Sequence, residues 1–253
     1  MAVIRGINRR LLLIAGIGGI AALFFIFKGK DPQGTTSETG ETFLLKIMKT
    51  HGGQQSWQDL DKISFTKSFS LYEADGTIEM QRQEKHSYDY TNGTSRLIQW
   101  QQDENTYNLV QNNETLSQVV DGQLDTISTA AQLRNKIQAS TFVLGLPFTL
   151  DTTENNLTYN GINSFEGDRA HELEVHFEGS DDVWWLYYSV DAMEWLGYWV
   201  KTSGHYSLVI NEQMVDVEGF MLSRKRKSYR TDSLRNKTYL RAEYLYANYT
   251  IIK

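Results

Sequence analysis

The stretch THGGQQSWQDLDKISFTKSFSLY, residues 50–72, decides the fold of this chain. Over residues 62–72 its apolar and polar residues alternate, which places each class on its own face of an extended strand. This period of two predicts a half-buried antiparallel strand. The face that we expect to turn inward carries five residues, one of them charged: Ile63, Phe65, Lys67, Phe69 and Leu71.

Two glycines separate this strand from the segment before it. Residues 41–50 carry apolar residues at helical spacing, and Gly52 and Gly53 follow them closely. Glycine readily adopts the left-handed backbone that ends many helices, so we expect a helix over 41–50 that ends at the glycine pair. The two glycines are therefore expected to set the angle between this helix and the sheet.

Alternating runs separated by turn-forming residues continue along the rest of the chain. One helix interrupts them over residues 125–146, with Asp125 or Thr126 as its N-cap and Pro147 after its end. The pattern predicts an α+β fold, a large antiparallel sheet of about eleven strands with its helices on one side. The further strands are expected near residues 77–90, 94–101, 105–112, 115–120, 157–163, 168–178, 183–190, 195–202, 205–211, 214–230 and 238–252.

A short set of residues and one later hairpin carry a family resemblance. The hairpin covers residues 184–201, with Asp191 in its turn and Ala192 after it, and the set comprises His51, Gly52, Gly53, Trp57, Phe65 and Phe69. Their order resembles that of the periplasmic lipoprotein-carrier superfamily, the lipoprotein localisation factor-like proteins, in an anchored branch; that family usually has proline where Ala192 stands. The resemblance implies a curved half-barrel with helices on its concave side, around a cavity that binds an acyl chain or another apolar ligand.

The N-terminal segment reads as a membrane anchor. Residues 11–27, LLLIAGIGGIAALFFIF, hold no charge, and about 17–25 such residues span a bilayer. Three arginines precede the run and two lysines follow it, which favours a cytoplasmic N-terminus. We expect a single-pass anchor in the inner (cytoplasmic) membrane over 1–30, a flexible linker over 31–40, and a binding domain over 41–253 in the periplasm or outside the cell. A cleaved signal peptide is the alternative, but bulky and charged residues follow where small ones are needed.

Composition argues against several kinds of function. The 253 residues include no cysteine, which excludes disulfides, thiolate metal sites and a cysteine nucleophile. The chain has 25 basic and 31 acidic residues, and five of the basic ones lie in residues 1–30, so the remainder carries a net charge of −11. An acidic domain repels phosphate backbones, and we expect no nucleic-acid partner.

The sequence shows no catalytic motif. In HELEVH, residues 171–176, the histidines are five apart, and in a strand they point to opposite faces, so this segment does not predict a zinc site. No nucleophile–base pair, phosphate-binding loop or dinucleotide fingerprint occurs outside the apolar segment. We therefore expect neither an enzyme nor a cofactor or metal.

Two charged stretches lie within predicted strands. In TIEMQRQEKHSYDY, Arg82, Glu84 and His86 continue the row that Met80 begins. The favoured interpretation is a solvated Arg82–Glu84 pair beyond the edge of the core, because charged residues are seldom buried. The alternative is a polar anchor for a ligand head group at the mouth of the cavity.

The second stretch is RKRKSYR, residues 224–230. Alternation would place Arg224, Arg226 and Arg230 on one face, where pairing with neighbouring acidic strands is the expected role in this acidic domain.

The function that the sequence favours is a membrane-anchored, extracytoplasmic binding protein for an apolar ligand, either a lipid or the acyl chain of a lipidated protein. The alternative is a sensor or scaffold of the same fold that binds a membrane-protein partner. A hydrolase ranks last. The candidate ligand-binding residues are Phe65, Phe69, Met80, Arg82, His86, Trp100, Trp184 and Tyr188.

Overall fold

The computed structural model describes residues 38–150, 155–202 and 204–253. The predicted anchor and nearly all of the predicted linker lie outside these residues. Within them no helix has the length and apolar character that crossing a membrane requires. The helices are α1 (Gly40–Thr50), α2 (Gln54–Gln58) and α3 (Ala130–Gly145). The strands are β1 (Lys62–Tyr72), β2 (Ile78–Asp89), β3 (Ser95–Gln102), β4 (Asn105–Asn112), β5 (Thr115–Val120), β6 (Gln123–Leu124), β7 (Asn155–Phe165), β8 (Asp168–Phe177), β9 (Val183–Ser189), β10 (Trp195–Thr202), β11 (His205–Val217), β12 (Phe220–Thr231) and β13 (Lys237–Ile252).

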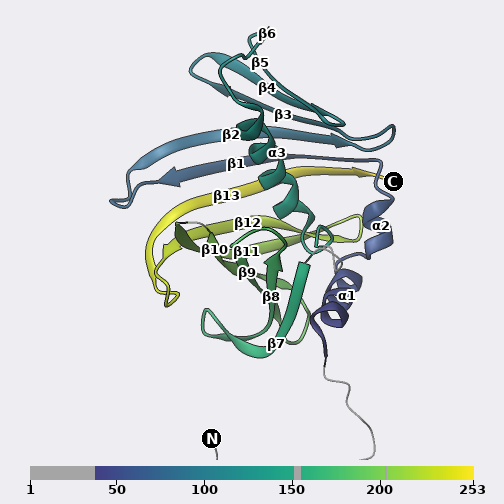
Figure 1. The fold of residues 1–253 in the computed structure, drawn as a ribbon, viewed down its shortest axis with the longest axis vertical. Helices are drawn as coiled ribbons and strands as arrows, with labels where there is room; N and C mark the ends of the chain where they lie inside the picture. The colour runs from purple at the N-terminus through teal and green to yellow at the C-terminus, as the bar shows by residue number, and fades with distance from the viewer. Residues whose placement is uncertain (1–37, 151–154, 203) are drawn as a thin grey trace, which may run out of the picture. The chain divides into compact units, whose positions relative to one another are not determined.

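All thirteen strands belong to one antiparallel sheet, in the order β6-β5-β4-β3-β2-β1-β13-β12-β11-β10-β9-β8-β7. The sheet thus consists of two meanders, β1 to β6 and β7 to β13, which meet where β1 pairs with β13. The sheet is strongly curved, as a half-barrel is, and α3 crosses its concave face (Figure 1). The antiparallel half-barrel with few helices therefore agrees with the predicted fold class.

The predicted strands were wrong in two places. The break predicted between residues 211 and 214 is absent, because β11 continues to Val217, and the turn lies instead at Glu218 and Gly219, both with positive φ. The two-residue strand β6 is too short to leave a periodic signal. Both differences concern local turns, and neither changes the class of sheet.

The central helix begins later than predicted. Its N-cap is Thr129, whose hydroxyl accepts the backbone N–H of Gln132 while the Gln132 side chain accepts the N–H of Thr129. This reciprocal capping box satisfies two donors that a free helix end would leave without partners. Asp125 instead accepts the N–H of Ile127 in the turn before the helix, at 2.8 Å.

The glycine pair has the predicted backbone. Gly52 has a φ of 121° and Gly53 a φ of 90°, values that L side chains rarely adopt. A Cβ at Gly52 would lie 2.6 Å from Phe220 Cδ1, so the end of α1 lies directly against the turn that joins β11 and β12. The short helix α2, which the sequence analysis did not predict, starts immediately after this pair.

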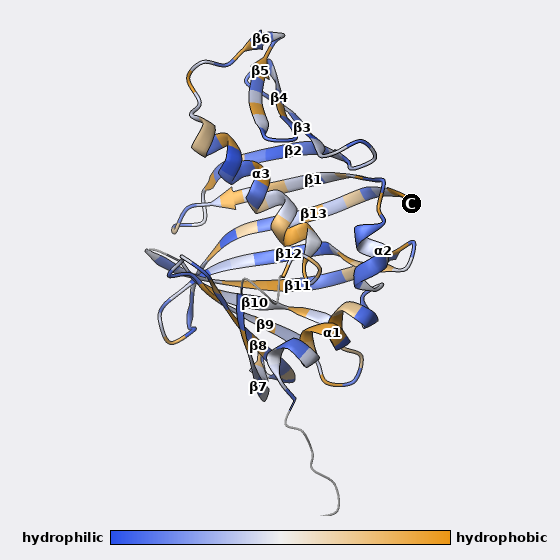
Figure 2. Cartoon of the chain, turned by 45° about the vertical axis from the view of Figure 1, so that its right-hand side comes forward, coloured by the Kyte–Doolittle hydropathy of each residue, from blue (hydrophilic) through white to orange (hydrophobic). Residues whose placement is uncertain are grey.

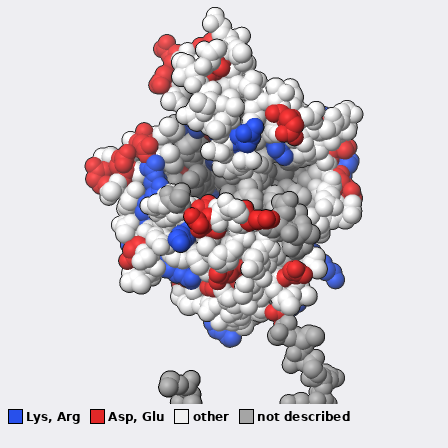
Figure 3. Space-filling view, in the orientation of Figure 1, with Lys and Arg blue, Asp and Glu red and all other residues white. Residues whose placement is uncertain are grey.

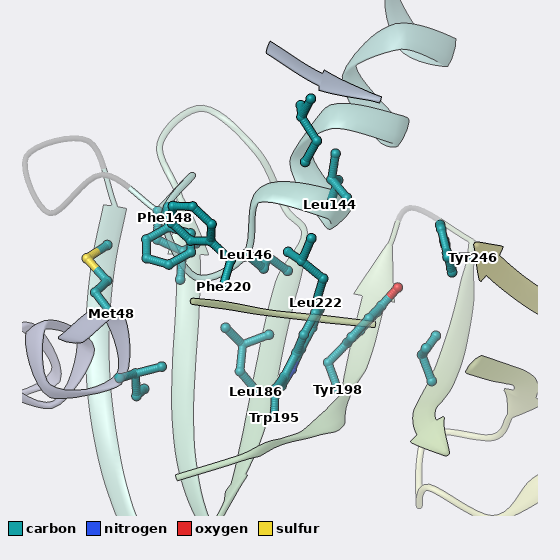
Figure 4. Close-up of a cluster of buried hydrophobic side chains, with 14 of the residues drawn as sticks. Met48, Leu144, Leu146, Phe148, Leu186, Trp195, Tyr198, Phe220, Leu222 and Tyr246 are labelled. Carbon is teal, nitrogen blue, oxygen red and sulfur yellow. The ribbon is translucent and has the colours of Figure 1, made fainter. Parts of the chain in front are cut away.

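The helices α1 and α3 bury apolar residues in the core, whereas α2 is mainly hydrophilic (Figure 2). In α1, Phe43 is fully buried and stacks on Tyr159 of β7, with ring centroids 4.4 Å apart. Close to the end of α1, Phe148 packs edge-on against Phe220, and in the same cluster Trp195 lies near Tyr198 (Figure 4). This core occupies part of the space between the helices and the sheet, and cavities remain beside it.

Candidate ligand-binding site

Two cavities lie beside α3 on the concave side of the sheet. One has a volume of about 400 Å³ and is called the basic cavity here; it is lined by Lys67, Arg226, Arg230 and Arg241 together with apolar side chains. The other, of about 950 Å³, is called the aromatic cavity; it is lined mainly by rings and aliphatic groups, among them Trp57, Leu60, Tyr88, Tyr90, Phe142 and Leu144. Both fall in the range of about 300–1,000 Å³ that is usual for small-molecule sites.

The helix α3 forms a wall of both cavities. Ala139 of α3 and Trp184 of β9 line each of them, so the two spaces are neighbours. Near its end, α3 packs on the sheet through Phe142, whose ring meets Trp184 edge-on at 5.3 Å between centroids. Near its start, Lys136 Nζ lies 3.3 Å from the centroid of Trp100 on β3. The helix therefore bridges the two meanders across the concave face.

Glu84 is buried with three basic neighbours. The residue is 2% exposed, and its carboxylate lies 2.8 Å from Arg82 Nη2, 3.1 Å from His86 Nε2 and 3.7 Å from Lys67 Nζ. Burial opposes ionisation, but the hydrogen bond from His86 and the charges of Lys67 and Arg82 outweigh it and lower the pKa of Glu84 to about 2. The favoured interpretation of a solvated Arg82–Glu84 pair was therefore wrong, because α3 and the aromatic side chains cover this row.

Further positive charge lies above this row. Burial, and then the charges of Arg82 and Lys67, lower the pKa of Lys136 to about 8. The Nε of Arg82 and the Nε1 of Trp100 are buried donors without a hydrogen-bond partner in the described part of the chain. Such donors are rare inside proteins, so the region around Trp100 has more donors than acceptors.

Three of the predicted ligand-binding residues line the cavities. Phe65 and His86 line the basic cavity, where their rings stack at 4.5 Å between centroids. Trp184 lines both cavities. Phe65 and His86 belong to the first meander and Trp184 to the second, and residues of α3 line the same cavities.

The other five lie elsewhere. Tyr188 is fully buried in the core, between Phe43 and His51. Phe69 lies under the Arg82 guanidinium, 5.1 Å from it, and Trp100 lies 5.0 Å from the same group. Met80, opposite Leu71 at the far end of β2, lines neither cavity. Arg82, Phe69 and Trp100 thus form a stacked group beside the basic cavity.

The prediction for the RKRKSYR stretch was wrong, because in the described part of the chain none of Arg224, Arg226 and Arg230 forms an ion pair with a carboxylate. Arg224 is exposed, the Arg226 Nε donates to Asn211 Oδ1 at 2.8 Å, and Arg230 donates to Ser207 Oγ at 2.8 Å. Lys227, on the opposite face of β12, does pair with Glu212 and Glu243. The alternation correctly placed Arg226 and Arg230 on one face of β12 and Lys227 on the other. It could not show that the face with the two arginines lines a cavity.

The histidines of HELEVH are separated as predicted. His171 is hydrogen-bonded to the Tyr159 hydroxyl at 2.6 Å, and His176 to Glu174 at 2.6 Å, on the other face of β8. Among residues 38–150, 155–202 and 204–253, no group of three or more His, Asp or Glu side chains is placed to hold a metal ion.

Comparisons with known proteins identify the fold. No family model and no curated protein matches the sequence. Among solved structures, a DUF1329 family protein from Desulfovibrio piger matches 85% of this chain and 94% of its own, with a TM-score of 0.53 and 9% identity. A LolA superfamily protein from Nitrosomonas europaea matches 86% of this chain and 95% of its own, also with a TM-score of 0.53 and 9% identity.

A putative outer membrane lipoprotein-sorting protein domain from Vibrio parahaemolyticus gives a TM-score of 0.52 at 10% identity, over 82% of this chain and 91% of that domain. Identities this low speak for the fold alone. The class of protein is therefore an antiparallel half-barrel closed by helices on one side. More particularly, the chain has a LolA-like fold, and the predicted resemblance to lipoprotein carriers is confirmed at that level.

Proposed function

We propose that this chain is an extracytoplasmic binding protein for the apolar part of a lipid or of a lipidated protein, held at the membrane by residues 11–27. The observation that carries the proposal is the pair of neighbouring cavities, about 950 and 400 Å³, between α3 and the concave face. Rings and aliphatic groups supply much of their walls, and removing apolar area from water is favourable by about 25 cal/mol per Å² before the cost of association is subtracted. The LolA-like fold supports the same interpretation, because the similar structures include a lipoprotein-sorting domain.

The test is uptake of a fluorescent fatty acid by the full chain. Protein purified in a non-ionic detergent would be delipidated and titrated with a dansyl-labelled fatty acid, and native mass spectrometry of untreated protein would show any lipid that co-purifies. We expect saturable binding with about one probe per chain. Absence of uptake, together with a stable protein partner in the native spectrum, would support the sensor or scaffold alternative and overturn the proposal.

A further inference from the structure

Arg226 is a buried guanidinium without an acidic partner. The residue is 4% exposed, and its side chain donates to Asn211 Oδ1 at 2.8 Å and to Ser223 Oγ at 2.6 Å. Its guanidinium carbon lies 4.7 Å from the ring centroid of Trp195 and 5.3 Å from that of Tyr246. No described carboxylate forms an ion pair with it. Arginine is almost never this buried unless it is paired, so the position calls for an anion.

The rest of the basic cavity adds charge of the same sign. Among the described residues, the Arg230 side chain has the Ser207 hydroxyl as its one hydrogen-bond partner, and Lys67 shares Glu84 with Arg82. Arg241 does have a carboxylate, that of Glu79, in an ion pair. No Asp or Glu is among the described residues that line the cavity. The cavity therefore carries an excess of cations inside a domain whose net charge is strongly negative.

On one face of the molecule this excess does not continue as a basic surface. On the face seen in Figure 3, acidic and basic side chains of the described residues are interspersed, without an extended basic patch. The positive charges of the cavity lie between the concave face of the sheet and α3, where the low dielectric strengthens their attraction for an anion. Because these positive charges line the cavity, they favour an anion that enters it over one that binds at the surface.

The remaining walls determine what kind of anion fits. Phe65, Val143, Tyr198 and Val209 supply apolar area in the basic cavity itself, and through Ala139 and Trp184 it adjoins the larger aromatic cavity. A small inorganic anion would leave this area without a partner. An amphiphile would fill it, with the charged group against the arginines and the chain against the rings.

We propose that the ligand is an anionic amphiphile, a lipid bearing a carboxylate or phosphate, whose head group is bound by Arg226, Arg230 and Lys67. The tail lies along α3 toward the aromatic cavity. A planar guanidinium donates two parallel hydrogen bonds to a carboxylate or phosphate, which suits arginine to this role. The inference rests on the proposed function, since it specifies the head group of the apolar ligand proposed above.

The test is a competition between probes that share one tail. The full chain, always in the same non-ionic detergent, would first be loaded with an uncharged fluorescent alkyl probe. Dodecyl phosphate, dodecanoate, dodecanol, dodecyltrimethylammonium and inorganic phosphate would then compete for it. We expect the two anionic amphiphiles to displace the probe at concentrations at least about tenfold lower than dodecanol, because a charged head group forms stronger hydrogen bonds with arginine than a hydroxyl does.

Variants assign the effect to the cavity. Arg230→Gln removes a partly exposed charge and Arg226→Gln the buried one, while Lys225→Gln removes the same charge from the opposite face of β12 as a matched control. We expect the preference for anions to fall about tenfold in Arg230→Gln and to stay unchanged in Lys225→Gln. If Arg226→Gln does not fold, Arg230→Gln and its control are sufficient for the test.

Three outcomes would overturn the inference, each in a recognisable way. If dodecanol and dodecyl phosphate displace the probe equally well, the proposed head-group site is refuted, but the proposed function is not. Inorganic phosphate acting as strongly as dodecyl phosphate would show an ion site without a tail. Failure of the uncharged probe and of every amphiphile to bind would refute the proposed function itself.

Discussion

Glu84 and His86, two residues apart on β2, are joined by a hydrogen bond of 3.1 Å between Glu84 Oε2 and His86 Nε2. The Nδ1 of the same ring lies 2.8 Å from the Tyr88 hydroxyl. Burial lowers the pKa of His86, so the ring is neutral near pH 7. A neutral ring that donates from Nε2 to the carboxylate accepts from Tyr88 at Nδ1, and each of the three residues satisfies its neighbour.

Removing the Glu84 charge should destabilise the domain. Glu84→Gln leaves Lys67 and Arg82 near each other without a counter-ion, which we expect to lower the free energy of unfolding by about 3 kcal/mol. Urea denaturation monitored by tryptophan fluorescence measures this change. Glu79→Gln is the matched control, because Glu79 pairs with Arg241 at a more exposed position and should cost less than about 1 kcal/mol. Equal effects of the two substitutions would contradict the buried cluster.

The same carboxylate should make stability depend on acid pH. The pKa of Glu84 falls from 4.5 to about 2 on folding, so its contribution is complete above pH 4.5 and is lost as the pH falls toward 2. Glu84→Gln should therefore flatten the loss of unfolding free energy between these pH values. A parallel pair of stability curves for the wild-type chain and the variant would show that Glu84 titrates normally.

The two glycines should differ in their tolerance of alanine. Gly53→Ala has only a backbone cost, about 1–3 kcal/mol for such a conformation, because the added Cβ would meet only Ser56 Oγ at 3.8 Å. Gly52→Ala should cost clearly more, since its Cβ would lie 2.8 Å from the carbonyl oxygen of Gly219 as well as against Phe220. Thermal unfolding of the two variants checks this order, and a smaller loss at Gly52 would refute it.

Removing the charge of Lys136 should stabilise the domain at neutral pH. The pKa of Lys136 is lowered to about 8 in the folded state, so its charge opposes folding below pH 8, and the cost is relieved as the pH rises toward 10.5. Lys136→Met should raise the melting temperature at pH 7, by about 2–4 °C for each kcal/mol gained. Arg134→Met, at an exposed position of the same helix, is the control and should have little effect. A lower melting temperature for Lys136→Met would show that the cation stabilises α3.

A large side chain on the inner side of α3 should block ligand uptake. Val143 lines the basic cavity, and Val143→Trp would occupy much of the space beside Trp184. We expect binding of the fluorescent fatty acid to fall at least about tenfold while the far-ultraviolet circular dichroism stays unchanged. Asn135→Trp, at an exposed position of the same helix, should bind as the wild-type chain does. Normal uptake by Val143→Trp would place the ligand elsewhere.

Periodicity predicted the sheet well because burial on one face leaves a direct record in the sequence. The alternation over β1 assigned Phe65 and Phe69 to the inner face, and both are buried there. The turn at Glu218 and Gly219 was missed because apolar residues lie on both sides of it, Val215 and Val217 before and Phe220 to Leu222 after, so the run looks continuous. Local patterns of this kind report the face of a strand but not its partner, and the pairing of β1 with β13 depends on contacts across most of the chain.

The candidate site was less accessible to sequence reasoning. Periodicity placed Glu84 on the row that continues from Met80, yet charged residues are usually exposed, and that general tendency favoured the wrong interpretation. Its cover comes from α3, a helix of weak amphipathic pattern that reaches both meanders, whereas Arg226 lies beside Trp195 and Tyr246 from distant strands. The sequence offered one indication of the site: Arg82, Glu84 and His86 continue the row that includes Met80. That α3 lies over this row could not be predicted from the sequence.

The pairing of β1 with β13 also has a consequence for how the protein is made. Residues 62–72 emerge early in synthesis, but their partner on one side, residues 237–252, is produced some 180 residues later. Until then β1 keeps an open edge, and a pairing so distant in sequence forms slowly. The junction between the two meanders therefore closes only after residues 237–252 have been made, although β1 can pair with β2 well before then.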